Sequence, residues 1–167
     1  MSDLDSTQKF SAALSALPLS TQRLIGGEFA KQVLHLVSDH RLQQVVDIAM
    51  NPGASHDEIQ MAYHLAHSVY VGTQPESEYS ELDFRRQAEH FVAQACMLCV
   101  APVNTDAEFV HLAQRIAMYC RMAITCSCMP HEQERELDFS HASEETEKLI
   151  ESQHEILQRY LGSQAAA

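Results

Sequence analysis

Apolar residues recur along this chain at intervals of three and four positions, which is the pattern of amphipathic α-helices. The first helix is predicted to end before Pro18, because the residue that precedes a proline is pushed out of the α region. A second helix is predicted from Ser20, which can cap it, to Val37. The residues expected to face the core are Leu4, Phe10, Leu14 and Leu17 in the first helix and Leu24, Phe29, Val33, Leu34 and Val37 in the second.

Gly26 and Gly27 fall inside the second of these helices. Each glycine costs about 1 kcal/mol relative to alanine in a helix interior. No phosphate-binding spacing surrounds the pair. We therefore expect a close approach by a neighbouring element, or a kink, in preference to a ligand-binding loop.

Turn and capping signals divide the middle of the chain into four further helices. Two of their starts carry a capping box, Ser55 with Glu58 and Thr105 with Glu108, whose side chains satisfy free N–H groups at a helix start. The predicted helices are 41–50, 55–72, 78–100 and a sixth beginning at Thr105. The residues predicted to face the core are Leu42, Val45, Val46 and Ala49 in the third helix and Ile59, Ala62, Tyr63, Ala66 and Tyr70 in the fourth. In the fifth helix they are Phe84, Ala88, Phe91, Val92, Ala95 and Cys99, and in the sixth Phe109, Ala113, Ile116, Ala117, Cys120 and Ile124.

The last predicted helix runs from about His131 to Gly162, a residue that commonly stops helices, and leaves a frayed tail over 163–167. Its second half has an apolar stripe and should pack on the bundle. Its first half, 131–147, carries few core-type residues beyond Leu137 and Phe139. The predicted stripe is Leu149, Ile150, Ile156, Leu157, Tyr160 and Leu161.

The chain has 167 residues, of which only 5 are glycine and 5 are proline. A β-sandwich or barrel would need many more turn residues, and a second core would be cramped at this length. The sequence therefore predicts an all-α fold, a single-domain helical bundle of about six to seven helices spanning 1–167.

The formal net charge is −12. Phosphate contacts need clusters of Lys and Arg, which the chain lacks, so nucleic-acid binding is excluded and anionic membrane surfaces are disfavoured. The acidic start and the lack of a long apolar run favour a cytoplasmic location over secretion or a membrane span. A basic protein is the partner that such a charge would attract.

Half of this charge lies between His131 and Arg159, where nine acids outnumber three bases. The acids lack the apolar surroundings that would make a paired-carboxylate catalytic site. Two interpretations stay open, a solvated helix face and a docking surface for a basic protein. The predicted partner-binding residues are Glu132, Glu134, Glu136, Asp138, Glu144, Glu145 and Glu147.

The five cysteines offer an alternative chemistry. Cys96 and Cys99 have CxxC spacing, and Cys126, Cys128 and His131 follow after a helix, so the count suffices for a zinc or redox site. The CxxC lies inside an apolar helix, however, where cysteines pack as small hydrophobes. We therefore expect no bound cofactor, and an odd number of cysteines fits a reducing compartment.

His64 and His67 stand on adjacent turns of the fourth helix, and an enzyme built around them is the third hypothesis. No Glu-x-x-His or His-Glu-x-x-His motif accompanies them, so we expect a partly buried, hydrogen-bonded pair. The charged start of the fifth helix, with Asp83 three residues before Arg86, is expected to be a solvated face with weak ion pairs. No catalytic residue is predicted.

Residues 17–102, with the segment LPLSTQRLIGGEFAKQVLHLVSDHRLQQVVDIAMNP and the later AYHLAHSVY, resemble an Ala-rich helical family of immunity proteins from bacterial polymorphic-toxin systems. The shared pattern is a helix with a Leu-rich end, a short Arg-containing helix, a breaker and an Ala/His-rich helix. The resemblance implies a protein without catalytic residues that neutralises a cognate toxin by direct binding. The acidic charge adds that this toxin is basic.

Overall fold

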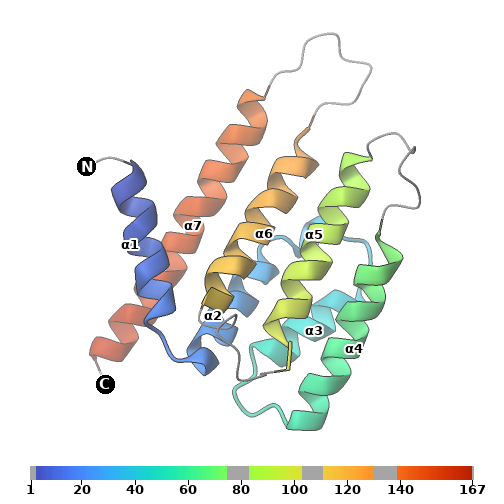
Figure 1. Ribbon diagram of the computed structural model, residues 1–167, viewed down its shortest axis with the longest axis horizontal. Helices are drawn as coiled ribbons and strands as arrows, with labels where there is room; N and C mark the ends of the chain where they lie inside the picture. Colours follow the sequence, from blue (N-terminus) through green and yellow to red (C-terminus); the bar gives the residue numbers. More distant parts are fainter. Residues whose placement is uncertain (1–2, 75–82, 103–110, 130–138, 167) are drawn as a thin grey trace.

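The last four helices of the chain lie side by side and run alternately up and down (Figure 1). The computed structural model describes residues 3–74, 83–102, 111–129 and 139–166. The four helices are α4 (His56–Gly72), α5 (Phe84–Cys99), α6 (Leu112–Ser127) and α7 (Ser140–Ala165). Neighbours in the sequence are thus neighbours in space, as in an up-and-down helical bundle.

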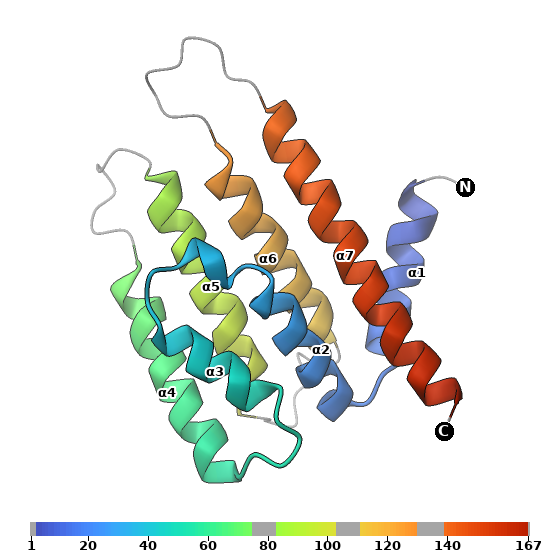
Figure 2. The same ribbon diagram turned by 180° about the vertical axis from the view of Figure 1, so that it is seen from behind.

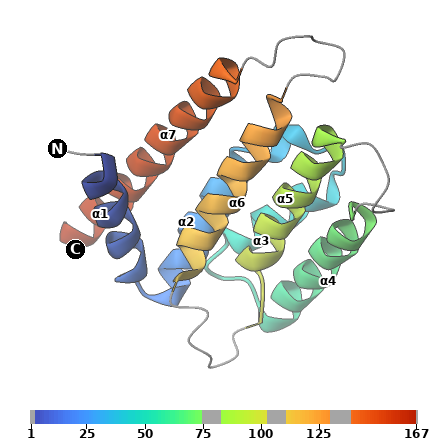
Figure 3. The ribbon, with the colours of Figure 1, turned by 45° about the horizontal axis from the view of Figure 1, so that its top comes forward.

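The N-terminal helices cover this row from two sides. Seen from behind, α2 (Leu19–Lys31) and α3 (Arg41–Ala49) cross in front of α5 and α6, joined by a turn of 3-10 helix, η1 (Leu34–Leu36) (Figure 2). On the other side, α1 (Asp3–Ser15) packs at the edge of the row, by α6 and α7 (Figure 3). The described residues contain seven α-helices and no strand, which confirms the predicted all-α bundle.

One connected core joins these helices, and α5 and α6 form its centre. The second half of α5 is buried on nearly every side, because α6 packs on one flank, α4 on the other, and α2 and α3 across its face. Most predicted inward residues are buried. One exception is Leu24, which is only half-buried while its neighbour Ile25 is fully buried.

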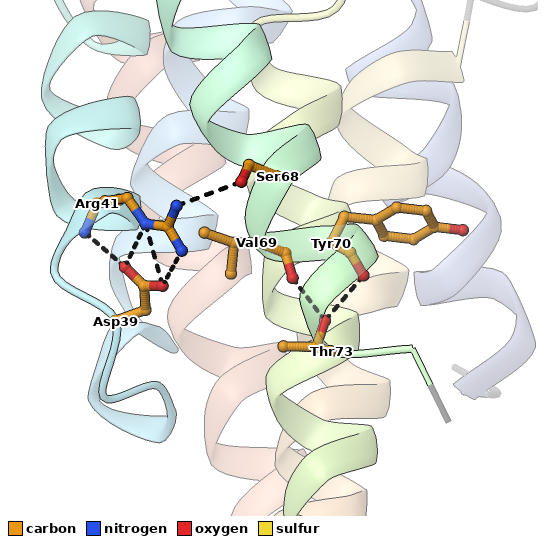
Figure 4. A network of polar contacts seen from close by, with 6 residues as sticks. All are labelled: Asp39, Arg41, Ser68, Val69, Tyr70 and Thr73. Atoms are coloured by element: carbon orange, nitrogen blue, oxygen red, sulfur yellow. Dashed lines mark hydrogen bonds and ion pairs between the residues drawn. The ribbon is translucent and has the colours of Figure 1, made fainter. Parts of the chain in front are cut away.

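Several predicted helix ends are confirmed by their caps. The Ser55 hydroxyl accepts the Glu58 N–H at 3.2 Å, and the Glu58 carboxylate accepts the Ser55 N–H at 2.7 Å. At the other end of α4, the Thr73 hydroxyl donates to the carbonyls of Val69 and Tyr70 (Figure 4). The second predicted box, at Thr105, lies outside the described residues.

The same close-up contains the contact that joins α3 to α4 (Figure 4). The Asp39 carboxylate accepts from the Arg41 guanidinium, with its shortest distance 2.6 Å, and from the Arg41 backbone N–H at 3.0 Å. A second guanidinium nitrogen donates to Ser68 at 3.3 Å. The α3 start is thus held against the outer face of α4.

Three predicted boundaries are wrong. Pro18, and not Ser20, is the residue before α2, because proline is tolerated at a helix start. The second helix ends at Lys31, and the predicted stretch to Val37 is η1 followed by extended chain. Asp83, predicted to lie inside the fifth helix, is its N-cap: its carboxylate accepts the Arg86 N–H at 3.1 Å, and α5 begins at Phe84.

The final helix is also shifted relative to the prediction of 131–162. Residues 130–138 lie outside the described part of the chain, and α7 begins at Ser140. It continues through Gly162 to Ala165, so Gly162 does not stop it and most of the expected frayed tail is helical. Phe139, one of the two core-type residues noted in the first half, is 49% exposed, whereas Ala142 is buried.

Gly26 and Gly27 are explained by close packing. The helix continues unbroken through both. A Cβ atom on Gly26 would lie 2.5 Å from Cδ1 of Ile116, and one on Gly27 would lie 2.7 Å from Cγ of Met50. The two glycines therefore let α6 and the end of α3 approach the α2 backbone.

None of the described helices is both long enough and apolar enough to cross a bilayer.

Candidate functional site

Three of the seven predicted partner-binding residues lie within the structure, on the first two turns of α7. Glu144 and Glu147 are exposed, and Glu145 is partly covered. The Glu145 carboxylate lies 2.6 Å from the Lys148 ammonium, and this hydrogen bond lowers the pKa of Glu145. The remaining four predicted residues lie outside the described residues: Glu132, Glu134, Glu136 and Asp138.

The exposed acids of α7 continue beyond the predicted set. Glu151 and Glu155 are also exposed. With Glu144 and Glu147 they are spaced three and four residues apart, so all four lie on one side of the helix. We call Glu144, Glu147, Glu151 and Glu155 the α7 acidic stripe. The buried residues of α7, such as Leu149, fall between them and hold the other side against the bundle.

The CxxC pair is part of the core. Cys96 and Cys99 on α5 and Cys120 on α6 are each 0 or 1% exposed. Burial raises the pKa of Cys99 to about 12 and those of Cys96 and Cys120 well above their usual value. The thiolate is the nucleophile and the metal ligand, so these thiols are held in their unreactive form.

The other two cysteines are not brought to this pair. The thiol of Cys126 lies 3.8 Å from the side-chain oxygen of Gln87, near the start of α5. At 1.5 Å per residue, Gln87 is about 13 Å along α5 from Cys96. Cys128 is partly exposed, and His131 lies outside the described residues. Within the described part of the chain, no group of three or more His, Cys, Asp or Glu side chains is arranged to hold a metal ion.

His64 and His67 lie on the exposed face of α4, so the predicted partly buried pair is wrong. The ring of His67 lies between those of Tyr63 and Tyr70, with centroid distances of 6.2 and 6.3 Å. A shallow depression adjoins His64, lined by Asp57, Gln60, Met61 and Leu65. These histidines do not face an enclosed site.

The structure also contains a cleft that the sequence did not predict, between α1 and α6. We call it the α1/α6 cleft. It has a volume of about 520 Å³. Thr7, Phe10 and Ser11 line it from α1, and His111, Gln114, Arg115, Ala117, Met118 and Arg121 line it from α6. At one end, the Ser15 hydroxyl and Nδ1 of His111 are 2.8 Å apart, which ties the end of α1 to the start of α6.

Arg121 is the most unusual group in this cleft. Its guanidinium carbon lies 5.3 Å from the centroid of the Phe10 ring, and the His154 imidazole stacks on that ring at 4.4 Å. The Arg121 Nε donates to the Gln153 side-chain oxygen at 2.7 Å, and Gln153 itself is fully buried. Burial lowers the pKa of Arg121, because it removes the charged guanidinium from water.

One guanidinium nitrogen of Arg121, Nη2, is buried and has no hydrogen-bond partner within the described structure. A buried donor left unpaired costs roughly 1–3 kcal/mol, and more when the group is charged. Native proteins retain few such groups, and an ordered water or an ion is among the partners that explain them.

Comparisons of the chain with protein families, with curated proteins and with solved structures give no match.

The cleft could not be predicted because its parts come from distant segments. The sequence places Phe10 and Gln153 in separate helices, and nothing in it pairs them with Arg121. One signal was present: α6 contains two arginines and no acid, in a chain with 23 acids and 11 bases.

Proposed function

We propose that this protein is a non-enzymatic binding protein, an immunity protein that neutralises a basic toxin by direct contact with the α7 acidic stripe. The observation that carries the proposal is the alignment of four exposed glutamates on one side of α7. The proposal includes a cytoplasmic location, which suits the three buried thiols of the core.

Charge is the reason that such a surface suits toxin capture. An immunity protein must bind its toxin before the toxin acts, and complementary charge raises association rates by about 10- to 1,000-fold at low salt. A toxin that acts on nucleic acid carries basic groups for the phosphates, and a row of carboxylates on a rigid helix presents charge of the same sign as its substrate.

The helix itself is suited to present these charges. Leu149, Ile156 and Leu157 bury one side of α7 in the core, so little order has to be gained when a partner binds the other side. Lys148 lies among the acids but is held by Glu145, which reduces its repulsion of a basic partner. The stripe thereby keeps its negative sign.

The test begins with the single stoichiometric basic partner recovered from the native cell lysate. We expect the association rate with the purified partner to fall at least tenfold between about 20 mM and about 500 mM salt, because screening shortens the range of the attraction. The quadruple variant Glu144→Gln, Glu147→Gln, Glu151→Gln, Glu155→Gln should show a slow rate at low salt as well.

A matched control removes acidic charge elsewhere. Asp47→Asn with Asp57→Asn changes two exposed acids on α3 and α4, and is compared with Glu147→Gln with Glu151→Gln. Only the α7 pair should slow association. Equal rates for the two pairs, or a rate that is flat with salt, would leave the stripe as a solvated helix face.

A further inference from the structure

The charge of α6 is opposite to that of the molecule. The helix carries Arg115 and Arg121 and no acidic residue, whereas the chain as a whole has a net charge of −12. Both arginines line the α1/α6 cleft, as does His111 at the start of the helix. The most cationic of the described helices thus faces the cleft from one side.

The cleft has the size and the mixed character of a ligand site. About 520 Å³ lies within the range of small-molecule pockets, which is about 300–1,000 Å³. Phe10, Ala117 and Met118 give it an apolar floor, while Thr7, Ser11 and Gln114 add hydroxyl and amide groups. Such sites are largely apolar with a few placed polar groups that orient the ligand.

Arg121 is fixed in a position that leaves part of its binding capacity unused. The Gln153 side-chain oxygen accepts a hydrogen bond from the Arg121 Nε–H, and the Phe10 ring packs against the guanidinium. The side chain is therefore held from both α7 and α1. Gln153 is held in turn, because its amide donates to the Ala117 carbonyl at 3.2 Å. The Nη2 atom is buried and has no hydrogen-bond partner among the described residues, so part of the donor capacity of Arg121 is unused.

We propose that the α1/α6 cleft binds a small organic anion, a carboxylate or a phosphate on a short apolar body. Arg121 and Arg115 bind the anionic head, and the apolar body lies over Phe10, Ala117 and Met118. This site is separate from the α7 acidic stripe and does not depend on the proposed function.

The composition of the cleft selects against other ligands. A cation would meet two guanidinium groups and, among the described lining residues, no carboxylate. A neutral apolar molecule would fill the floor but leave Nη2 of Arg121 unpaired. Nucleic acid is disfavoured because the acidic surface repels it.

Four probes separate the parts of the ligand: octanoate, octyl phosphate, inorganic phosphate and the neutral octyl glucoside. Binding to the full-length protein is measured by calorimetry and by the shift of the unfolding temperature at low salt. We expect octanoate or octyl phosphate to bind at micromolar to millimolar concentrations and octyl glucoside to bind at least tenfold more weakly. Binding by inorganic phosphate as tight as octyl phosphate would assign the site to the free ion and overturn the role of the apolar body.

The matched variants are Arg121→Gln and Arg115→Gln in the cleft and Arg85→Gln on the exposed face of α5. Each removes one positive charge. Both cleft variants should lose about tenfold or more in affinity for the anionic probe, because each removes a charged donor, and Arg85→Gln should bind as the unmodified protein does.

Because Arg121 also contacts Gln153, its loss can weaken the fold, so each variant is first checked by circular dichroism and thermal unfolding. Arg115→Gln tests the cleft without disturbing that contact. Undiminished affinity in Arg115→Gln and in folded Arg121→Gln would overturn the proposal, as would equal binding of octyl glucoside and octanoate or no binding of either anion at millimolar concentrations.

Discussion

At the scale of single residues, two histidines are partly buried in positions that disfavour protonation of the imidazole ring. His154 stacks on Phe10 beside Arg121, and burial, assisted by the arginine charge, lowers its pKa from the usual 6.5. His90 stacks on Tyr70 at 4.4 Å, and burial lowers its pKa as well, against an opposing backbone contact. Both side chains fit the folded state as neutral rings.

This predicts a loss of stability on mild acidification. The unfolded chain protonates its histidines near pH 6.5, whereas folded His154 and His90 do so at lower pH. The stabilisation is therefore complete above about pH 6.5 and is lost as the pH falls through the folded pKa values. Urea unfolding at about pH 7.5 and about pH 5.5 should give a lower free energy of unfolding at the lower pH, above the range where carboxylates titrate.

The variant His154→Gln should flatten this dependence, and His64→Gln, on the exposed face of α4, is the control that should leave it unchanged. Proton NMR titration of the His154 ring provides a direct readout. Arg121→Gln should raise the pKa of that ring, since it removes a nearby positive charge. An unchanged or lowered value would contradict this account.

At the scale of the helices, the sequence predicted correctly those helix ends that are fixed by contacts between residues within one turn. Ser55 and Glu58 lie within one turn, so their mutual capping is specified by four residues, and α4 begins where predicted. Gly162 was expected to end α7, but a glycine stops a helix only if the chain leaves it in a different conformation, and here the helix continues. The end of a helix depends on the conformation of several residues together, which a single residue does not specify.

The remaining differences between prediction and structure arise from contacts between helices that are far apart in the sequence. Leu24 and Ile25 are both apolar, and only the position of α6 and α3 around α2 determines that Ile25 is the one fully buried. The α1/α6 cleft depends on α7 supplying Gln153 to Arg121. Periodicity identifies the buried side of a helix but not its neighbour, so the bundle was predictable and the cleft was not.

The glycine pair gives a prediction at this scale. Gly26→Ala should lower the free energy of unfolding by up to about 2 kcal/mol, because overpacking costs about 1–3 kcal/mol while the gain in helix propensity is about 1 kcal/mol. The atom in the way is Cδ1 of Ile116, so Ile116→Val should cost less in the Gly26→Ala background than alone. Chemical denaturation of the four proteins measures this coupling.

The control is Gly162→Ala on α7. It lies within a helix, and a Cβ atom there would have no atom within 4 Å, so the same substitution should stabilise the protein by up to about 1 kcal/mol. Equal effects at the two sites would show that the approach of α6 to α2 is not limited by the glycine.

At the scale of the whole molecule, the α7 acidic stripe and the α1/α6 cleft differ in charge and in shape. The α7 acidic stripe follows the net charge and is exposed on one long helix, where a protein partner can reach it. The α1/α6 cleft is lined by two arginines, against the sign of the net charge, and has a volume of about 520 Å³. The two proposed sites of this single domain are therefore of opposite charge.

The position of α1 at the edge of the bundle has a consequence for motion. Most other α-helices pack on two or more neighbours, whereas α1 makes its substantial backbone approach to α6 alone and buries chiefly Phe10 and Leu14. Free energies of local opening are low where few apolar contacts hold a segment. In native-state hydrogen exchange, the amides of α1 should lose protection before those of α5 and α6. Because one wall of the cleft is α1, an anion bound there should slow hydrogen exchange in α1 selectively. The exchange rate of the α1 amides would then report whether the cleft is occupied.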